Sequence, residues 1–364
     1  MSEQLSDLAV VVYGATGFTG RLVCAELARR KVRFAIAGRD RTKLTTLAAS
    51  LSSQPQVFEA PLDDPAKLQA AIARGAVVLA CAGPFARMGA PVRDAALAAG
   101  RHYLDITGEA NYMLETYERD AEAKKRGVAL VNAVGFDVVP TDCAAVLAAE
   151  AVGGAPDDVK IGIKFGGRPT QGTTRSAMER ADSGGLAFVD GHYQPERLGA
   201  ARWTAPFPAP IGPRATVSIA WGDLATAPRS TNARTLRTYV TLPAAATALL
   251  PVVGLATKAL AWGPAKKLAE RWIQSLPEGP TNDERARARC AIIAEATKNG
   301  RTARTWLTCH DGYDFTAIAA VECAIRASSP TFTATGALTP SQAFGALSLL
   351  ESLKTLNAAD FGTS

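Results

Sequence analysis

Three glycines spaced by two residues each stand near the start of the chain, at Gly14, Gly17 and Gly20. The unbroken apolar run 8–13 before them predicts a buried parallel strand, and apolar residues at helical spacing follow them. Strand, glycine turn and helix together are typical of a dinucleotide site, although this turn is one residue longer than the standard fingerprint. A glycine turn without a ligand is the alternative. The candidate cofactor-binding residues here are Gly14, Thr16, Gly17, Phe18, Thr19 and Gly20.

The second predicted strand, 33–37, is followed by Arg39, where an NAD enzyme usually carries Asp or Glu for the ribose 2′-hydroxyl. A guanidinium suits a 2′-phosphate better, because it offers charge-assisted hydrogen bonds to phosphate oxygens. The sequence therefore predicts NADP(H), with Arg41 and Lys43 as further candidates. A solvated basic loop with Asp40 as the partner of Arg39 is the alternative.

More candidates follow the later predicted strands, 76–81, 102–107 and 128–134. The carboxyl ends of parallel strands meet at one edge of a sheet, and ligands bind beyond that edge. Asp105 could instead be a turn residue and Asp137 a helix cap, so the sequence singles out no proton donor. The further cofactor-binding candidates are Ala82, Gly83, Pro84, Thr107 and Gly108, and the catalytic candidates are Tyr103, Asp105, Asp137 and Tyr313.

Predicted strands and helices alternate through the first 148 residues, which indicates the α/β class with a Rossmann-type doubly wound parallel sheet. A hairpin around the pair 299–300 indicates a second, α+β domain carrying an antiparallel sheet. We place the first domain at 1–148, with a return of 335–364 to it, and the second domain at 149–334. One long polar helix is expected over 112–125.

The 364 residues carry a net charge of +6, and the dense charged run 283–289 mixes both signs, so we expect a solvated strand start and no nucleic-acid partner. Six scattered cysteines and three histidines show no metal-ligand spacing, so we expect no metal. The first apolar run is already a strand rather than a signal peptide, which favours a reducing cytoplasm.

The stretch 239–263 has a single charged side chain, Lys258. Its length would suffice to span a bilayer, but Pro243, Pro251 and Gly254 interrupt it. Three interpretations stay open: buried or dimer-interface helices, an interfacial patch or acyl-chain site, and a membrane span. We also expect a homodimer.

Taken in order, these motifs resemble the saccharopine dehydrogenase-like oxidoreductases, and within them the trans-acting enoyl reductases of bacterial lipid and polyketide pathways. The resemblance implies an NADP(H)-binding Rossmann domain, reduction of an unsaturated acyl chain that a carrier protein could present, and peripheral membrane contact. It is most specific in the first 145 residues. It rests on the segments 14–20, 37–39, 82–85, 103–109, 135–142, 172–176 and 312–316.

Two other functions remain open at this stage. A saccharopine-type enzyme would act on an imine and would need cations for amino-acid carboxylates, for which Arg168, Arg175 and Arg180 are candidates. A lipid-surface protein with a non-catalytic nucleotide site is the other, because a fold and a cofactor do not prove an activity.

Overall fold

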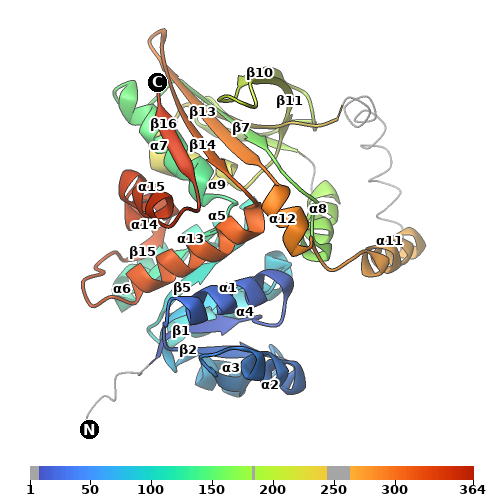
Figure 1. Cartoon of the computed structure of the whole chain (residues 1–364). Coiled ribbons are helices and arrows are strands. Elements are labelled where there is room, and N and C mark those ends of the chain that lie inside the picture. Colours follow the sequence, from blue (N-terminus) through green and yellow to red (C-terminus); the bar gives the residue numbers. More distant parts are fainter. Residues whose placement is uncertain (1–7, 183–184, 244–262) are drawn as a thin grey trace. The chain divides into compact units, whose positions relative to one another are not determined.

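A computed structural model describes residues 8–182, 185–243 and 263–364 (Figure 1). Two compact units divide the chain. Unit 1 comprises Met1–Val139 and Tyr313–Gly345, and unit 2 comprises Pro140–Gly312 and Ala346–Ser364. Each unit contains its own β-sheet.

The sheet of unit 1 is parallel, with the strand order β15-β6-β5-β4-β1-β2-β3. The central position of β1 confirms the doubly wound topology, since the chain reverses direction across the sheet on either side of it. Val10, Val11 and Val12 are fully buried, as the apolar run predicts. The strands are β1 Leu8–Tyr13, β2 Phe34–Gly38, β3 Gln56–Glu59, β4 Gly75–Ala80, β5 His102–Asp105, β6 Ala129–Val131 and β15 Gly336–Leu338.

The helices of unit 1 connect and cover these strands. An ion pair of 2.8 Å between Arg30 and Glu322 joins the end of α1 to α13, which lie side by side in Figure 1. The expected helix over 112–125 is two helices, α5 and α6. The helices are α1 Phe18–Arg29, α2 Arg41–Ser50, α3 Pro65–Ile72, α4 Phe85–Ala98, α5 Ala110–Tyr117, α6 Asp120–Arg126, α13 Gly312–Ala327 and α14 Pro340–Phe344.

The sheet of unit 2 is mainly antiparallel and runs β10-β11-β12-β7-β13-β14-β16, with β8 on β12 and β9 on β8. One pair, β12 with β7, is parallel. Positive φ angles of 50° at Asn299 and 77° at Gly300 form the predicted hairpin turn. The strands are β7 Asp158–Lys164, β8 Leu186–Val189, β9 His192–Pro195, β10 Arg202–Pro206, β11 Pro213–Ile219, β12 Thr235–Val240, β13 Cys290–Lys298, β14 Arg301–Cys309 and β16 Asp360–Thr363.

The charged run that we expected to start a strand instead forms helix α12. Thr281 and Glu284 make a capping box, in which each side chain accepts a hydrogen bond from the backbone of the other. Such a box starts a helix, so the pattern Thr-x-x-Glu at 281–284 predicts a helix here rather than the strand that we expected. The helices of this unit are α7 Val139–Ala151, α8 Gln171–Asp182, α9 Asp223–Thr231, α11 Gly263–Ser275, α12 Asn282–Arg287 and α15 Ala346–Thr355.

The two units do not follow our predicted boundaries of 148/149 and 335–364. Helix α13 belongs to unit 1, and of the final stretch only the part with β15 and α14 does. Residues from Ala346 onward belong to unit 2, because β16 pairs with β14 there. An apolar helix face predicts burial, but it does not say against which sheet.

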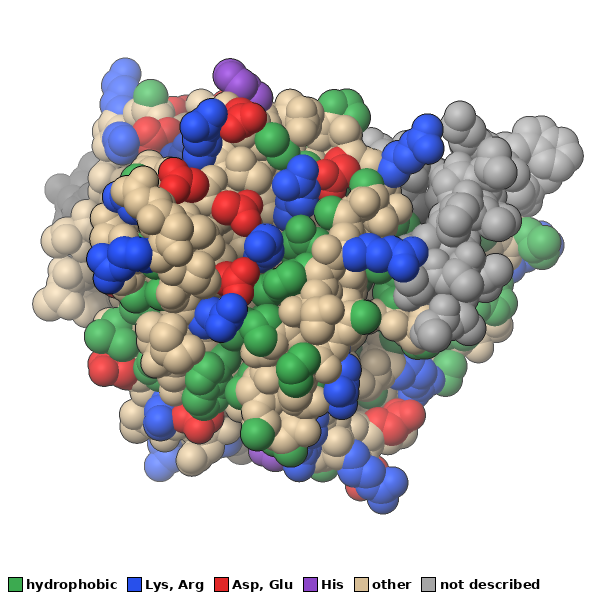
Figure 2. Space-filling view, turned by 90° about the horizontal axis from the view of Figure 1, so that it is seen from above, with side chains coloured by type: hydrophobic (Ala, Val, Ile, Leu, Met, Phe, Trp, Pro, Cys, Tyr) green, Lys and Arg blue, Asp and Glu red, His purple; other side chains and the backbone are tan. Residues whose placement is uncertain are grey.

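The apolar stretch 239–263 is described only at 239–243 and at 263, so the interpretations offered for it fall largely outside the described residues. In the part of the chain that is described, no helix combines the length and the apolar character that crossing a membrane requires. On the face shown in Figure 2, lysine and arginine side chains are interspersed with acidic ones.

Candidate functional site

The turn after β1 contains glycines that the fold itself requires. Gly14 adopts φ +80°, and a Cβ atom there would lie 2.7 Å from the backbone nitrogen of Ala82. A Cβ atom at Gly20 would lie 2.4 Å from the carbonyl oxygen of Gly14. Both positions therefore exclude side chains for steric reasons.

Gly17 differs from these two glycines. It is exposed, its φ of −70° suits any residue, and a Cβ atom there would meet only the Gly14 carbonyl oxygen, at 3.5 Å. The described fold therefore gives no reason for a glycine at this position. A ligand that approaches the backbone would give one.

The positive end of the α1 helix dipole lies at the glycine turn. Among the described residues, no side chain caps this end with a hydrogen bond, and the first turn of α1 has no acidic residue. The N-terminal end of a helix carries partial positive charge, which favours phosphate groups. Arg21 Nη1 donates a hydrogen bond of 2.8 Å to the carbonyl oxygen of Thr16, which adds a cation to this turn.

Tyr313 lies beside this turn, although almost 300 residues separate it from Phe18 in the sequence. The two rings meet edge to face, with centroids 5.3 Å apart and an interplanar angle of 78°. Both residues belong to unit 1 and both are half-buried. The structure thus brings one predicted catalytic residue next to the predicted cofactor-binding residues Phe18 and Thr19.

The end of β2 is followed by a cation. The guanidinium of Arg39 is exposed and makes no hydrogen bond or ion pair with any described residue. Asp40, which we considered as its partner, instead caps α2 by accepting a hydrogen bond of 3.0 Å from the Lys43 backbone. This hydrogen bond lowers the pKa of Asp40, and the Lys43 ammonium lies 3.6 Å from its carboxylate. Arg41 is also exposed.

The end of β4 leads through Ala82, Gly83 and Pro84 into α4, and only Gly83 of these three is exposed. The start of α4 is occupied by a carboxylate of the same chain. Glu109 accepts hydrogen bonds of 3.0 Å from the Phe85 backbone and 2.8 Å from the Ala86 backbone. A carboxylate at this position offsets the positive end of the helix dipole. No local sequence pattern predicts this role of Glu109, because 24 residues separate it from the first of its donors.

The end of β5 is closed by its own hydrogen bonds. Asp105 is fully buried and accepts from the Thr107 backbone (3.0 Å), the Ala133 backbone (2.9 Å) and Asn132 Nδ2 (2.7 Å). Burial raises the pKa of Asp105 to about 6. The buried Thr107 hydroxyl accepts from the Glu109 backbone at 3.1 Å.

Two predicted catalytic residues, Tyr103 and Asp105, are buried and hydrogen-bonded within unit 1. Tyr103 is fully buried, and its hydroxyl lies 3.0 Å from the hydroxyl of Tyr112. Burial raises the pKa of Tyr103 well above its usual range. Neither Tyr103 nor Asp105 presents its side chain to solvent, so the alternative of a turn aspartate describes Asp105 better. Gly108 is half-buried beside this turn, and Asp137 is half-buried two residues before α7.

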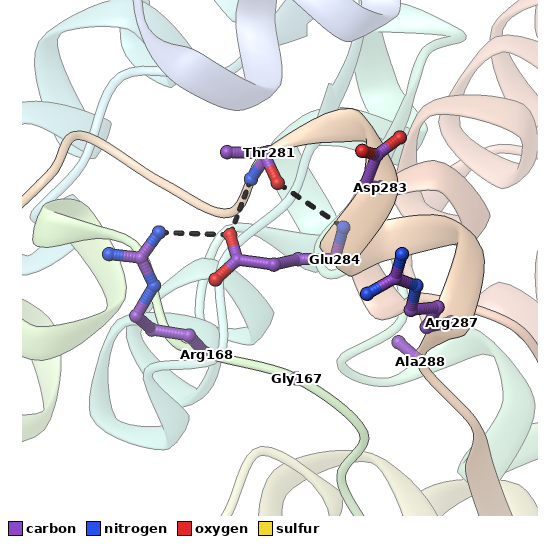
Figure 3. Close-up of a pocket in the computed structure, with 7 residues that line it drawn as sticks. All are labelled: Gly167, Arg168, Thr281, Asp283, Glu284, Arg287 and Ala288. Atoms are coloured by element: carbon purple, nitrogen blue, oxygen red, sulfur yellow. Dashed lines mark hydrogen bonds and ion pairs between the residues drawn. The ribbon is translucent and has the colours of Figure 1, made fainter.

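Unit 2 holds a hollow of about 520 Å³ (Figure 3). Arg168 donates from Nη2 to Glu284 Oε2 and to the Gly279 carbonyl oxygen, both at 3.0 Å. This ion pair involves one of the three arginines that we considered as candidates for binding amino-acid carboxylates. Arg175 is half-buried, and the side chain of Arg180 lies outside the described residues. The hollow is lined by Gly167, Arg168, Thr281, Asp283, Glu284, Arg287 and Ala288.

Comparison with known families gives a match over the first sheet. Residues 10–131 match the model described as saccharopine dehydrogenase NADP binding domain. This part of the chain is a saccharopine dehydrogenase NADP-binding domain. It contains the glycine turn, Arg39 and the closed end of β5.

Relatives and solved structures extend the comparison. A trans-acting enoyl reductase of Mycobacterium leprae is 34% identical over 148 residues, covering 39% of this chain and 35% of the relative. A saccharopine dehydrogenase-like oxidoreductase of Bos taurus is 29% identical over 201 residues, covering 49% of this chain and 47% of that protein. The matched segment thus spans about a third to a half of the length of these curated relatives.

The fold match covers more of the chain than the sequence matches do. Saccharopine dehydrogenase (L-Glu forming) from Saccharomyces cerevisiae superposes with a TM-score of 0.67 over 98% of this chain and 99% of that chain. At 13% identity this likeness concerns the fold alone. The match to the NADP-binding domain therefore rests on sequence, whereas unit 2 shows only a likeness in fold.

Proposed function

We propose that this chain is an NADPH-dependent reductase that acts on the carbon–carbon double bond of an enoyl acyl substrate. The observation that carries the proposal is Gly17, an exposed glycine that neither backbone angle nor packing requires. Its bare backbone at the uncapped start of α1 suits a pyrophosphate. The names of the mycobacterial relatives supply the enoyl substrate class.

The residues around the turn would bind different parts of the cofactor. Gly14, Gly17 and Gly20 shape a backbone surface for the pyrophosphate, with Thr16, Phe18 and Thr19 around it. Arg39, with Arg41 and Lys43, would pair with the 2′-phosphate, because the Arg39 guanidinium has no partner among the described residues. Ala82, Gly83 and Pro84, together with the backbone at Thr107 and Gly108, line the ends of the neighbouring strands. The cofactor, when bound, supplies the hydride.

The chain itself must supply a proton at the α-carbon or stabilise the enolate oxygen. Tyr313 is our candidate for this role, because it lies against Phe18 of the nucleotide turn and carries a phenol. Asp137 is a second candidate. Tyr103 and Asp105 are not, because both side chains are fully buried and hydrogen-bonded within unit 1.

The test measures NADPH oxidation from the loss of NADPH absorbance, with enoyl-CoA thioesters of short, medium and long chain as substrates. We expect turnover with at least one enoyl thioester and none with the saturated thioester of the same length. Tyr313→Phe should lower kcat while leaving the Kd for NADPH near that of the wild type.

Two results would contradict the proposal. Turnover with an amino acid and a keto acid, but with no enoyl thioester, would support a saccharopine-type imine reaction. NADPH binding without turnover of either substrate class would support the non-catalytic alternative. Delivery by a carrier protein, a homodimer and peripheral membrane contact are parts of the proposal that vesicle flotation, size-exclusion chromatography and acyl carrier assays would test.

A further inference from the structure

Two cysteines face each other at the open end of the long hairpin in unit 2. Cys290 is the first residue of β13 and Cys309 the last residue of β14, and the two are register partners. Directly opposed residues of an antiparallel pair have Cα atoms about 4.5 or 5.5 Å apart. Disulfides need about 4.4–6.8 Å. The register therefore already provides the spacing that a disulfide requires.

The hydrogen bonds to Cys290 favour a thiolate there, whereas burial and the nearby Asp311 carboxylate oppose it. The Cys290 Sγ atom accepts a hydrogen bond of 3.3 Å from the Gly166 backbone. A second hydrogen bond, from the Cys309 thiol, lowers the pKa of Cys290, and it raises the pKa of Cys309 well above its usual range. These shifts favour the thiolate at Cys290 and the protonated thiol at Cys309.

We propose that Cys290 and Cys309 form a redox-active dithiol that a small-molecule disulfide, such as oxidised glutathione, converts into an intramolecular disulfide. The Cys290 thiolate attacks one sulfur of oxidised glutathione, which forms a mixed disulfide and releases one glutathione thiolate. Cys309 then loses its proton to solvent and attacks the Cys290 sulfur, which releases the second glutathione. Two cysteine thiols are oxidised and one glutathione disulfide is reduced to two thiols.

The position of the pair decides how it is reached and what it controls. The side chains are only 2% and 6% exposed, but both lie at strand ends, where local opening costs less than in the middle of a sheet. The chain passes from unit 2 into unit 1 three residues after Cys309. A disulfide would restrain the backbone at the start of this connecting segment. Oxidation is therefore expected to slow hydrogen exchange in residues 309–312.

The other four cysteines provide controls within the same chain. All six lie in the described part of the protein and are thiols. Cys323 is fully buried in α13. Cys24 and Cys81 are close enough that charge on one raises the pKa of the other, which makes them a rival pair in unit 1.

The experiment treats the reduced, full-length protein with oxidised glutathione under native conditions and blocks the remaining thiols in denaturant. Intact mass and peptide mapping then count and locate them. We expect a loss of two of the six thiols, a single cross-linked peptide pair containing Cys290 and Cys309, and full reversal by dithiothreitol. Cys323→Ser should form the same disulfide, and Cys309→Ser should stop at a glutathione adduct on Cys290.

Peptide mapping of the wild type tests the proposal even if a serine variant fails to fold. Retention of all six thiols under native conditions would overturn it, and so would a cross-link between Cys24 and Cys81 in place of the expected one. A Cys290–Cys309 bridge that forms only after circular dichroism shows unfolding would overturn it as well.

Discussion

Two strand ends at the same edge of the first sheet show opposite designs. After β1, the turn at Gly17 is exposed, and no described side chain caps the helix that follows. After β5, Asp105 and Glu109 use their carboxylates to bind backbone N–H groups of the same chain. The more reactive residue types thus lie in the closed region and the bare backbone in the open one. Residue type alone does not identify a binding site, because a ligand needs polar groups that are not already hydrogen-bonded within the protein.

The largest effect is expected from Gly17→Val. The new side chain would occupy the space of a phosphate oxygen and should remove two or more charge-assisted hydrogen bonds of about 1.5–3 kcal/mol each, a loss of roughly a hundredfold or more in NADPH affinity. Titration by fluorescence or calorimetry measures this. The melting temperature should stay near that of the wild type.

Gly20→Val is the matched control for that change. Its side chain would collide with the Gly14 carbonyl oxygen, so we expect lost stability rather than a selective loss of binding. Unchanged NADPH affinity in a folded Gly17→Val protein would mean that the open turn is not the pyrophosphate site.

Asp105→Ala should show the converse behaviour. It would leave buried donors at Thr107, Ala133 and Asn132 without their acceptor, and the free energy of unfolding should fall by about 3 kcal/mol. Urea denaturation measures the loss. Asp40→Ala, which removes an exposed helix cap, should cost only about 1 kcal/mol. Wild-type stability combined with abolished NADPH binding would show that Asp105 serves the ligand rather than the fold.

Arg39→Ala should weaken NADPH binding roughly ten- to a hundredfold, equivalent to about 1.5–3 kcal/mol, and leave NADH binding unchanged. Unfolding free energy should change by less than about 0.5 kcal/mol, because the side chain is exposed and pairs with no described residue. Arg41→Ala is the matched control, with a smaller effect expected. A wild-type preference for NADH would contradict the assignment of the 2′-phosphate to Arg39.

The smallest effect concerns pH, and it separates the two ends of β5. Burial lowers the pKa of His102, whose Nδ1 accepts a hydrogen bond from the Ala129 backbone. The fold therefore favours the neutral ring, and this stability is present above the unfolded pKa of about 6.5 and lost as pH falls below it. Asp105 acts in the opposite direction, since its raised pKa favours the protonated form and its contribution is lost as pH rises through about 6.

Unfolding curves at several pH values for the wild type and His102→Asn test this. The variant should lose part of the acid sensitivity below about pH 6.5, whereas His310→Asn, at an exposed position, should retain it. An identical pH dependence in all three proteins would remove His102 from the explanation.

Local patterns predicted the parts of the fold that depend on near neighbours. The buried strands β1 and β4 follow from apolar runs, and the hairpin turn follows from Asn299 and Gly300, which accept positive φ. The steric roles of Gly14 and Gly20 were also readable, because the turn and the helix start that impose them are adjacent in sequence.

Long-range partners were not readable in this way. The carboxylate of Glu109 at the start of α4, the ring of Tyr313 against Phe18, and the pairing of β16 with β14 each join segments far apart in the sequence. The same holds for Asp105, whose residue type suggested chemistry while its hydrogen-bond partners Asn132 and Ala133 lie on another segment.

The sequence by itself determined the class of the first domain and the position of its glycine turn, because strand, glycine turn and helix are set by the backbone preferences of neighbouring residues. Only the tertiary structure decided which polar side chains remain free to bind a ligand. A side chain that is hydrogen-bonded within the protein cannot bind a ligand with the same atoms, and Asp105, Tyr103 and Glu109 have hydrogen-bond partners on other segments of the chain. That is why Gly17 and Arg39 remain as binding candidates while two of the four catalytic candidates became parts of the core.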